Sequence, residues 1–323
     1  ELGETRVTLL DTPGHVDFSA EMERTLQVLD CAVLVISGTD GVQGHTRTLW
    51  DLLERYQVPT FLFINKMDLA GADRGALLAH LKNKLSGGCV DFGDPDTLWE
   101  EAAVCDEAAL EQYLETGELP EDMISRLIGE RKLFPCYFGS ALKVEGVDEL
   151  LAGVERYAPQ PAYPAEFGAK VFKIMRDAQG ARLTHMKITG GALHTKELLT
   201  GREGDTVWQE KADQLRLYSG AKFHPVDTAE AGAVVAVTGL SHTFPGQGLG
   251  IEPDWSGAVL QPVLTYRVEL TDGTDPHTAL QKLRQLEEED PQLHIVWNNG
   301  EIHAQLMGEV QMEVLQRLIR ERL

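Results

Sequence analysis

The chain has 323 residues, 43% of them hydrophobic and 25% charged, which is ordinary for a soluble globular protein and long enough for two or three domains. Acidic residues outnumber basic ones by 51 to 29, and the net charge of -22 excludes a general nucleic-acid coat protein, although one basic patch could still contact RNA. No apolar run approaches the roughly 20 residues that span a bilayer, no signal peptide is visible, and the four cysteines form no CxxC pair. We therefore expect a cytoplasmic protein with no membrane partner and no zinc or redox motif.

Short apolar runs alternate with amphipathic stretches over the first 65 residues. The runs 7–10, 32–36 and 60–64 have the continuous apolar character of strands buried on both faces of a parallel sheet. Between them, 18–29 and 46–56 place apolar residues at helical spacing. The order β-α-β-α-β predicts a doubly wound α/β domain.

The same pattern resumes with a strand over 134–138 and a helix over 147–157, before prolines at 159–164 indicate a linker. Between the two parts, residues 91–122 carry twelve acids and no Lys or Arg. We expect a solvated insertion there, at about 86–132; the alternative is a surface for a basic partner.

Two further patterns follow the linker. Short strand-like runs separated by glycine-rich turns predict a small β-barrel, with strands over 170–174, 183–188, 214–218 and 233–237. The last pattern is one strand short of a ferredoxin-like unit. It consists of a strand over 264–270, a helix over 278–288, a hairpin around Asn298-Asn299-Gly300 and a last helix over 310–319. The expected domains are 1–160, 165–255 and 260–323.

The motif Asp11-Thr12-Pro13-Gly14-His15 directly follows the first predicted strand. Open α/β sheets bind ligands at the carboxyl ends of their strands, and in nucleoside triphosphatases an Asp there holds magnesium, often through water. Gly14 would let the backbone approach a terminal phosphate, and His15 could orient an attacking water. We therefore assign Asp11 to magnesium and His15 to catalysis.

Two more motifs follow strands at the same predicted sheet edge. Asn65-Lys66-Met67-Asp68 follows the run 60–64, and Ser140-Ala141 follows the strand 134–138. The Asp68 carboxylate can accept hydrogen bonds from the N1–H and 2-amino groups of guanine, which adenine does not offer as a pair. Asn65 would brace the loop, the Lys66 stem would cover the ring, and the Ser140-Ala141 backbone could contact the guanine carbonyl oxygen.

Each motif alone has an ordinary structural explanation, because DTPG can be a helix cap with a turn and NKMD a polar loop. Together they are more specific, since three motifs stand in order at strand ends, 54 and then 75 residues apart. They predict a site for GTP or GDP with magnesium.

With these motifs the chain resembles the translational GTPases of the elongation factor G family over essentially its whole length. Val237–Gly248 looks like the end of that family's second domain, and Met307–Val314 like the start of the third domain's last helix. Within the family it is most similar to the ribosomal protection proteins that confer tetracycline resistance, on residues 110–114, 133–141 and Gln311-Met-Glu-Val314. Elongation factor G usually reads HLE where this chain has Gln311-Met312-Glu313.

The resemblance implies a monomeric GTPase acting on the ribosome, with His15 positioning water once ribosomal RNA orders it. The chain departs from the family pattern in lacking a P-loop, GxxxxGK[ST], the threonine-bearing switch loop and the C-terminal domains. We therefore expect a fragment that is inactive as given, whose parent protein hydrolyses GTP.

Other functions stay open. A nucleotide-incompetent ribosome-binding protein and a translation factor paralogue without a resistance role are the alternatives; a dehydrogenase is disfavoured because no GxGxxG opens a helix. A cluster of basic residues on the first barrel strands could meet ribosomal RNA, but solvated side chains explain it equally well: Lys170, Lys173, Arg182, Lys187 and Lys196.

Overall fold

The computed structural model describes residues 2–3, 5–255, 257–270 and 273–322. The chain divides into two compact units. The first unit comprises Glu1–Val7 and Leu29–Pro161, and the second comprises Thr8–Val28 and Ala162–Leu323. The three-domain division expected from the sequence stays a prediction, and its outermost residues, 1 and 323, lie outside the described residues.

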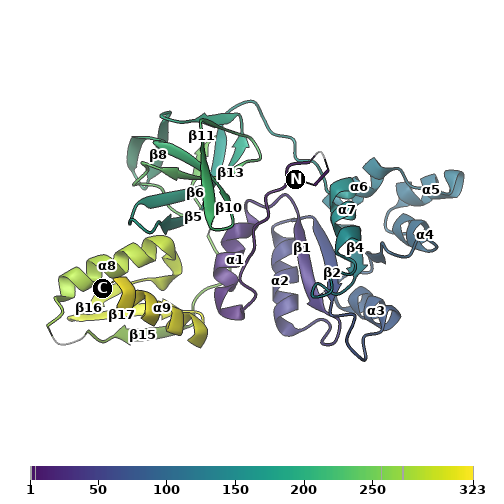
Figure 1. The fold of residues 1–323 in the computed structure, drawn as a ribbon, viewed down its shortest axis with the longest axis horizontal. Coiled ribbons are helices and arrows are strands. Elements are labelled where there is room, and N and C mark those ends of the chain that lie inside the picture. Colours follow the sequence, from purple (N-terminus) through teal and green to yellow (C-terminus); the bar gives the residue numbers. More distant parts are fainter. Residues whose placement is uncertain (1, 4, 256, 271–272, 323) are drawn as a thin grey trace. The chain divides into compact units, whose positions relative to one another are not determined.

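A parallel sheet of four strands forms the centre of the first unit, in the order β1-β2-β4-β3. Figure 1 labels β1, β2 and β4 of this sheet. Its strands are β1 (Ala32–Ser37), β2 (Thr60–Asn65), β3 (Cys89–Asp91) and β4 (Phe134–Phe138). The helices of the unit are α2 (Gly44–Arg55), α3 (Arg74–Lys84), α4 (Leu98–Ala103), α5 (Glu107–Thr116), α6 (Glu121–Gly129) and α7 (Val147–Tyr157). The parallel pairing of β1 with β2 and of β2 with β4 confirms the α/β class.

The strand predicted over 7–10 is wrong, because the structure has no strand there and Leu9 is 86% exposed. The apolar character of β1 also does not mean burial on both faces. Val33 and Val35 point to the same face of the sheet and are exposed, whereas β2, in the interior of the sheet, is buried from Thr60 to Ile64. A short apolar run shows that a strand is possible, but its neighbours decide whether it pairs and whether both of its faces are covered.

The acidic stretch is a folded part of the first unit and not only a solvated insertion. Helices α4, α5 and α6 bury apolar side chains in the same cluster as the sheet, among them Ala102, Ala109, Ile124 and Leu127. Its acids are mostly at the surface, since they occupy the outward-facing positions of these helices. The sequence reasoning counted the charges but overlooked the apolar residues between them.

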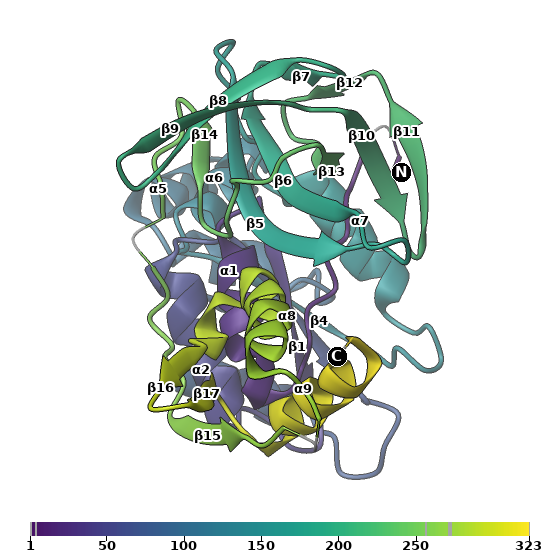
Figure 2. The same cartoon turned by 90° about the vertical axis from the view of Figure 1, so that its left-hand side faces the viewer.

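The second unit contains the predicted β-rich region, and the structure has strands at all four predicted positions (Figure 2). Six strands form an antiparallel sheet in the order β11-β10-β13-β6-β5-β14, and β12 pairs with β7 and β8 with β9. The strands are β5 (Gly168–Arg176), β6 (Arg182–Gly190), β7 (Ala192–His194), β8 (Leu198–Glu203), β9 (Thr206–Lys211), β10 (Gln214–Ser219), β11 (Lys222–Val226), β12 (Thr228–Glu230), β13 (Val234–Thr238) and β14 (Gly248–Gly250). They enclose one hydrophobic cluster that includes Val171, Met186, Ile188 and Leu193.

The last segment has the predicted order β-α-β-β-α. It comprises β15 (Leu264–Val268), α8 (Pro276–Glu289), β16 (Val296–Asn298), β17 (Glu301–Leu306) and α9 (Glu309–Arg322), with a sheet in the order β15-β17-β16. Asn299 and Gly300 both have positive φ, 51° and 86°, as the tight turn of a two-residue hairpin requires. The hairpin predicted from Asn298-Asn299-Gly300 is therefore confirmed.

The short helices η1 (Val16–Phe18) and α1 (Ser19–Leu26) belong to the second unit. Lys173 of β5 pairs with Glu21, and the buried Glu23 accepts hydrogen bonds from the N–H groups of Val259 and Leu260 at 2.7 and 3.0 Å. Lys187 of β6, itself buried, donates to the Val28 carbonyl at 3.0 Å. Polar contacts therefore hold both α1 and the Val28 backbone that follows it.

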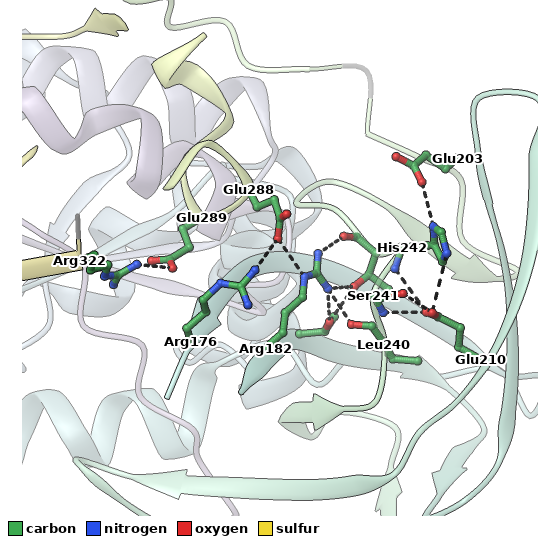
Figure 3. A network of polar contacts seen from close by, with 12 residues as sticks. Arg176, Arg182, Glu203, Glu210, Leu240, Ser241, His242, Glu288, Glu289 and Arg322 are labelled. Atoms are coloured by element: carbon green, nitrogen blue, oxygen red, sulfur yellow. Dashed lines mark hydrogen bonds and ion pairs between the residues drawn. The ribbon is translucent and has the colours of Figure 1, made fainter. Parts of the chain in front are cut away.

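A polar network joins the β-rich region to α8 (Figure 3). Arg182 donates to Glu288 at 3.2 Å, to the Leu240 carbonyl at 2.8 Å and to Thr243, and Arg176 pairs with the same Glu288 at 3.1 Å. All five basic residues that could have formed an RNA-binding stripe therefore have partners within the protein, because Lys170 pairs with Glu252 and Lys196 with Asp213. The structure favours the ordinary structural explanation of that cluster.

Candidate functional site

Two loops meet where β2 and β4 end in the first unit. Asn65 is the last residue of β2, and its Oδ1 accepts hydrogen bonds from the backbone N–H groups of Lys66 and Ala141, both at 2.8 Å. The Gly139 N–H donates to the Ile64 carbonyl at 2.9 Å. A single amide oxygen thus joins segments that are 76 residues apart in the chain.

Lys66 has a positive φ of 66°, an uncommon conformation for a residue with a side chain. The Asn65 side chain holds that strained backbone by accepting from the Lys66 N–H. The Lys66 side chain is exposed, as covering a ligand ring would require. The bracing role expected for Asn65 therefore has a definite geometry, with one oxygen and two N–H groups.

The Asp68 carboxylate lies in the same loop pair. A hydrogen bond from the Ser140 hydroxyl is the main cause that lowers the pKa of Asp68, and Lys143 Nζ, 3.5 Å from Oδ2, adds to it. Asp68 is therefore ionised at neutral pH and offers only hydrogen-bond acceptors. Its side chain is 13% exposed, so part of the carboxylate still reaches the surface.

The contacts of Ser140 and Ala141 differ in detail from the sequence expectation. The Ser140 side chain is buried and supports Asp68, while its N–H donates to the Glu145 carbonyl at 2.9 Å. The Ala141 N–H, expected to face a guanine oxygen, donates to Asn65 instead, so a ligand oxygen would have to share it. Sequence reasoning missed Lys143, whose only signal was a basic residue two positions after Ala141.

The other three predicted residues, Asp11, Gly14 and His15, belong to the second unit. The Asp17 N–H donates to His15 Nδ1 at 3.2 Å, and His15 occupies the N-cap of η1. In a neutral imidazole whose Nδ1 accepts, the proton resides on Nε2. The His15 side chain is half-exposed, so this Nε2–H donor is available at the surface.

Gly14 is not required by the local fold. An added Cβ would meet no atom within 4 Å, and Gly14 is not among the glycines with positive φ. Neither a close contact nor a left-handed backbone therefore explains a glycine at this position. A reason outside the fold, such as the approach of a ligand to the backbone, is consistent with this geometry.

The part of the chain that the structure describes contains no group of three or more His, Cys, Asp or Glu side chains placed to hold a metal ion. Asp11 is a single exposed carboxylate. This fits a magnesium ion, which keeps several waters and takes one or two carboxylates together with substrate phosphates. None of the helices among the described residues is long and apolar enough to cross a membrane.

Comparison with known proteins identifies what the chain is similar to. Residues 2–160 match the model of the elongation factor Tu GTP binding domain, so the chain carries a guanine-nucleotide-binding domain. Over 97% of its length the chain is 29% identical to the tetracycline resistance protein TetP of Clostridium perfringens, and over 98% it is 28% identical to elongation factor G 1 of Bdellovibrio bacteriovorus. TetM of Ureaplasma urealyticum is 29% identical over 98% of the chain.

The chain spans about half the length of these curated relatives, covering 52%, 56% and 53% of them. A crystal structure of a protein from Thermus thermophilus superimposes with a TM-score of 0.82 at 24% identity, covering 97% of this chain and 55% of that one. The structural likeness shows the fold and confirms a multidomain architecture with an α/β domain followed by antiparallel sheets.

Proposed function

We propose that this chain is a member of the elongation factor G family of translational GTPases, and that it is the part of a ribosome-dependent GTPase that selects the guanine base and positions the water for hydrolysis. The reaction is hydrolysis of GTP to GDP and phosphate, with magnesium as the metal and the ribosome as the partner. The protein acts in the cytoplasm as a monomer. The activity belongs to the complete gene product.

The observation that carries this proposal is the paired loop at the ends of β2 and β4. Asn65 fixes the backbone of both loops, and the ionised Asp68, supported by Ser140, offers two carboxylate oxygens. Guanine presents two adjacent N–H donors on its Watson–Crick edge, which a carboxylate accepts as a pair. Adenine presents a donor next to an acceptor, and an acceptor facing the carboxylate is disfavoured.

Three residues of the second unit serve hydrolysis in this proposal. Asp11 would hold magnesium through water, and magnesium when bound supplies positive charge to the phosphate oxygens. Gly14 would donate its backbone N–H to the terminal phosphate. His15, with Nδ1 occupied by the Asp17 N–H, would donate from Nε2–H and so orient the attacking water rather than remove its proton.

The test changes the nucleotide preference of the complete gene product from guanine to xanthine. Asp68→Asn replaces an acceptor by an amide donor, and xanthine carries a 2-oxo acceptor where guanine carries a 2-amino donor. GTP affinity should fall by roughly 10- to 150-fold, the equivalent of about 1.5–3 kcal/mol for a charge-assisted hydrogen bond, while xanthosine triphosphate binds better. Calorimetric titration with both nucleotides measures the exchange.

Asp73→Asn is the matched control, because Asp73 caps α3 through the Ala76 N–H at 2.8 Å and Asn caps a helix equally well. It should leave both affinities unchanged. An unchanged GTP affinity in Asp68→Asn would contradict the base-selecting role. A complete gene product that binds no guanine nucleotide would favour the rival function, a ribosome-binding protein without nucleotide.

Tetracycline protection is a second candidate, and the relatives named tetracycline resistance proteins TetP and TetM favour it. Elongation factor G 1 matches at a similar identity, so an ordinary translation factor is its direct competitor. Expression of the complete gene in a sensitive bacterium, with growth measured against tetracycline, separates the two. No gain in resistance combined with ribosome-stimulated GTP hydrolysis would reject protection and keep the GTPase.

A further inference from the structure

The carboxylate of Asp17 caps a helix that lies almost 300 residues further along the chain. Asp17 Oδ2 accepts hydrogen bonds from the N–H groups of Val310 and Gln311, at 2.8 and 3.3 Å, in the first turn of α9. The residue before α9 is Gly308, which has no side chain with which to cap the helix itself. Asp17 therefore supplies both the acceptor and the negative charge that a helix N-terminus favours.

Gly308 gives this contact its close fit. A Cβ at Gly308 would lie 2.2–2.4 Å from the Asp17 carboxylate, far inside van der Waals distance. Asp17 is buried, with 8% of its surface exposed. Any side chain at Gly308 would therefore displace Asp17 from the end of α9.

A second route joins the same elements. Gln311 accepts from the Met307 N–H at 2.7 Å through Oε1 and donates to Asp290 at 3.0 Å through Nε2. Asp290, at the end of α8, also pairs with Arg24 of α1 at 3.1 Å. The Gln311 N–H also donates to Asp17, so Gln311 takes part in both sets of contacts. Together these contacts connect η1 to α9, α9 to α8 and α8 back to α1.

Asp17 also contacts His15 directly. The same residue that caps α9 with its side chain donates its backbone N–H to His15 Nδ1. Asp17 thus links the position of α9 to the orientation of the His15 imidazole.

We propose that Asp17 is a positioning residue for His15, which holds the imidazole in its water-orienting geometry only while its carboxylate caps α9. This inference rests on the proposed function, since it assigns no chemistry to Asp17 itself. It makes docking of the last segment onto η1 a condition for hydrolysis. Displacement of α9 from Asp17 would release His15 without any change in the base-binding loops.

The experiment is a double-mutant cycle between Asp17 and His15 in the complete gene product, with single-turnover GTP hydrolysis on ribosomes as the readout. Asp17→Ala should lower the rate about tenfold or more and leave the GTP dissociation constant unchanged, because it shifts His15 and not the nucleotide site. Asp17→Asn keeps an oxygen acceptor for α9 and should retain most of the rate. In a His15→Ala background, Asp17→Ala should have no further effect.

Gly308→Ala displaces the carboxylate without altering Asp17 or His15, and it should reproduce the loss seen in Asp17→Ala. Gly44→Ala is its control, since an added Cβ there meets no atom within 4 Å. In the 323-residue chain itself, hydrogen exchange should show lost protection at the Val310 and Gln311 amides in Asp17→Ala but not in Asp17→Asn.

The outcomes separate this inference from the function on which it rests. His15-dependent hydrolysis that is unaffected by Asp17→Ala and Gly308→Ala would overturn the positioning role alone. A rate loss of equal size with and without His15 would also overturn it, because a merely structural role gives that result. Hydrolysis that is unchanged in His15→Ala would overturn the proposed mechanism itself.

Discussion

Removal of the Asn65 side-chain oxygen should loosen the candidate base site and weaken guanine nucleotide binding together. In Asn65→Ala, the N–H groups of Lys66 and Ala141 lose hydrogen bonds of 2.8 Å each. Each such bond contributes about 0.5–1.5 kcal/mol net, so the two together contribute about 1–3 kcal/mol to the native loop arrangement. If a nucleotide must restore this arrangement on binding, its affinity falls by roughly 5- to 150-fold.

Asn65→Asp provides the matched comparison, because its carboxylate keeps acceptors for both N–H groups. We expect Asn65→Asp to retain most of the stability that Asn65→Ala loses. Hydrogen exchange of peptides covering 60–65 and 134–141 in the 323-residue chain measures the local loosening, and GDP titration of the complete gene product measures the affinity. Wild-type exchange and affinity in Asn65→Ala, or an equal loss in both variants, would refute this account of the loop pair.

Two further predictions concern the second unit. Burial lowers the pKa of His185 to about 4. Between pH 6.5 and 4 the unfolded chain therefore binds a proton at His185 that the native chain does not bind. The free energy of unfolding should fall by about 3 kcal/mol over this range because of His185. In urea unfolding at both pH values, His185→Leu should show a correspondingly smaller loss than the wild type, and parallel pH profiles would contradict the assignment. Gly14→Ala should change the free energy of unfolding of the chain by less than about 0.5 kcal/mol, because its Cβ meets open space, yet lower GTP hydrolysis by the complete gene product at least about tenfold. Full activity in that variant would remove the phosphate-contacting role of Gly14.

Sequence periodicity and turn chemistry predicted most of the regular elements correctly. The strands β2 and β4, the helices α2 and α7 and the hairpin at Asn299-Gly300 all appear where apolar spacing and turn residues placed them. These signals are local, since a helix face repeats within four residues and a two-residue turn needs only its own φ angles. The sequence motifs likewise identified Asn65 and Asp68 as candidate site residues.

Local signals failed where the outcome depended on distant neighbours. The run 7–10 has the composition of a strand but no strand forms there, and the acidic stretch contains a buried apolar face that its charges concealed. The support of Asp68 by Ser140 and Lys143 depends on how two loops meet across 75 residues, which no spacing within either loop encodes.

The sequence by itself thus determined the class of fold, the order of elements and the residue types available for guanine recognition. The tertiary structure decided what those residues contact. It alone paired Glu21 of α1 with β5 and Arg24 with Asp290 at the end of α8, gave the basic cluster of the β-rich region partners within the protein, and brought Asp17 to Val310 across 293 positions. A capping carboxylate can be recognised from the sequence only when it directly precedes the helix that it caps. A carboxylate that folding brings from a distant part of the chain leaves no signal in the residues around that helix.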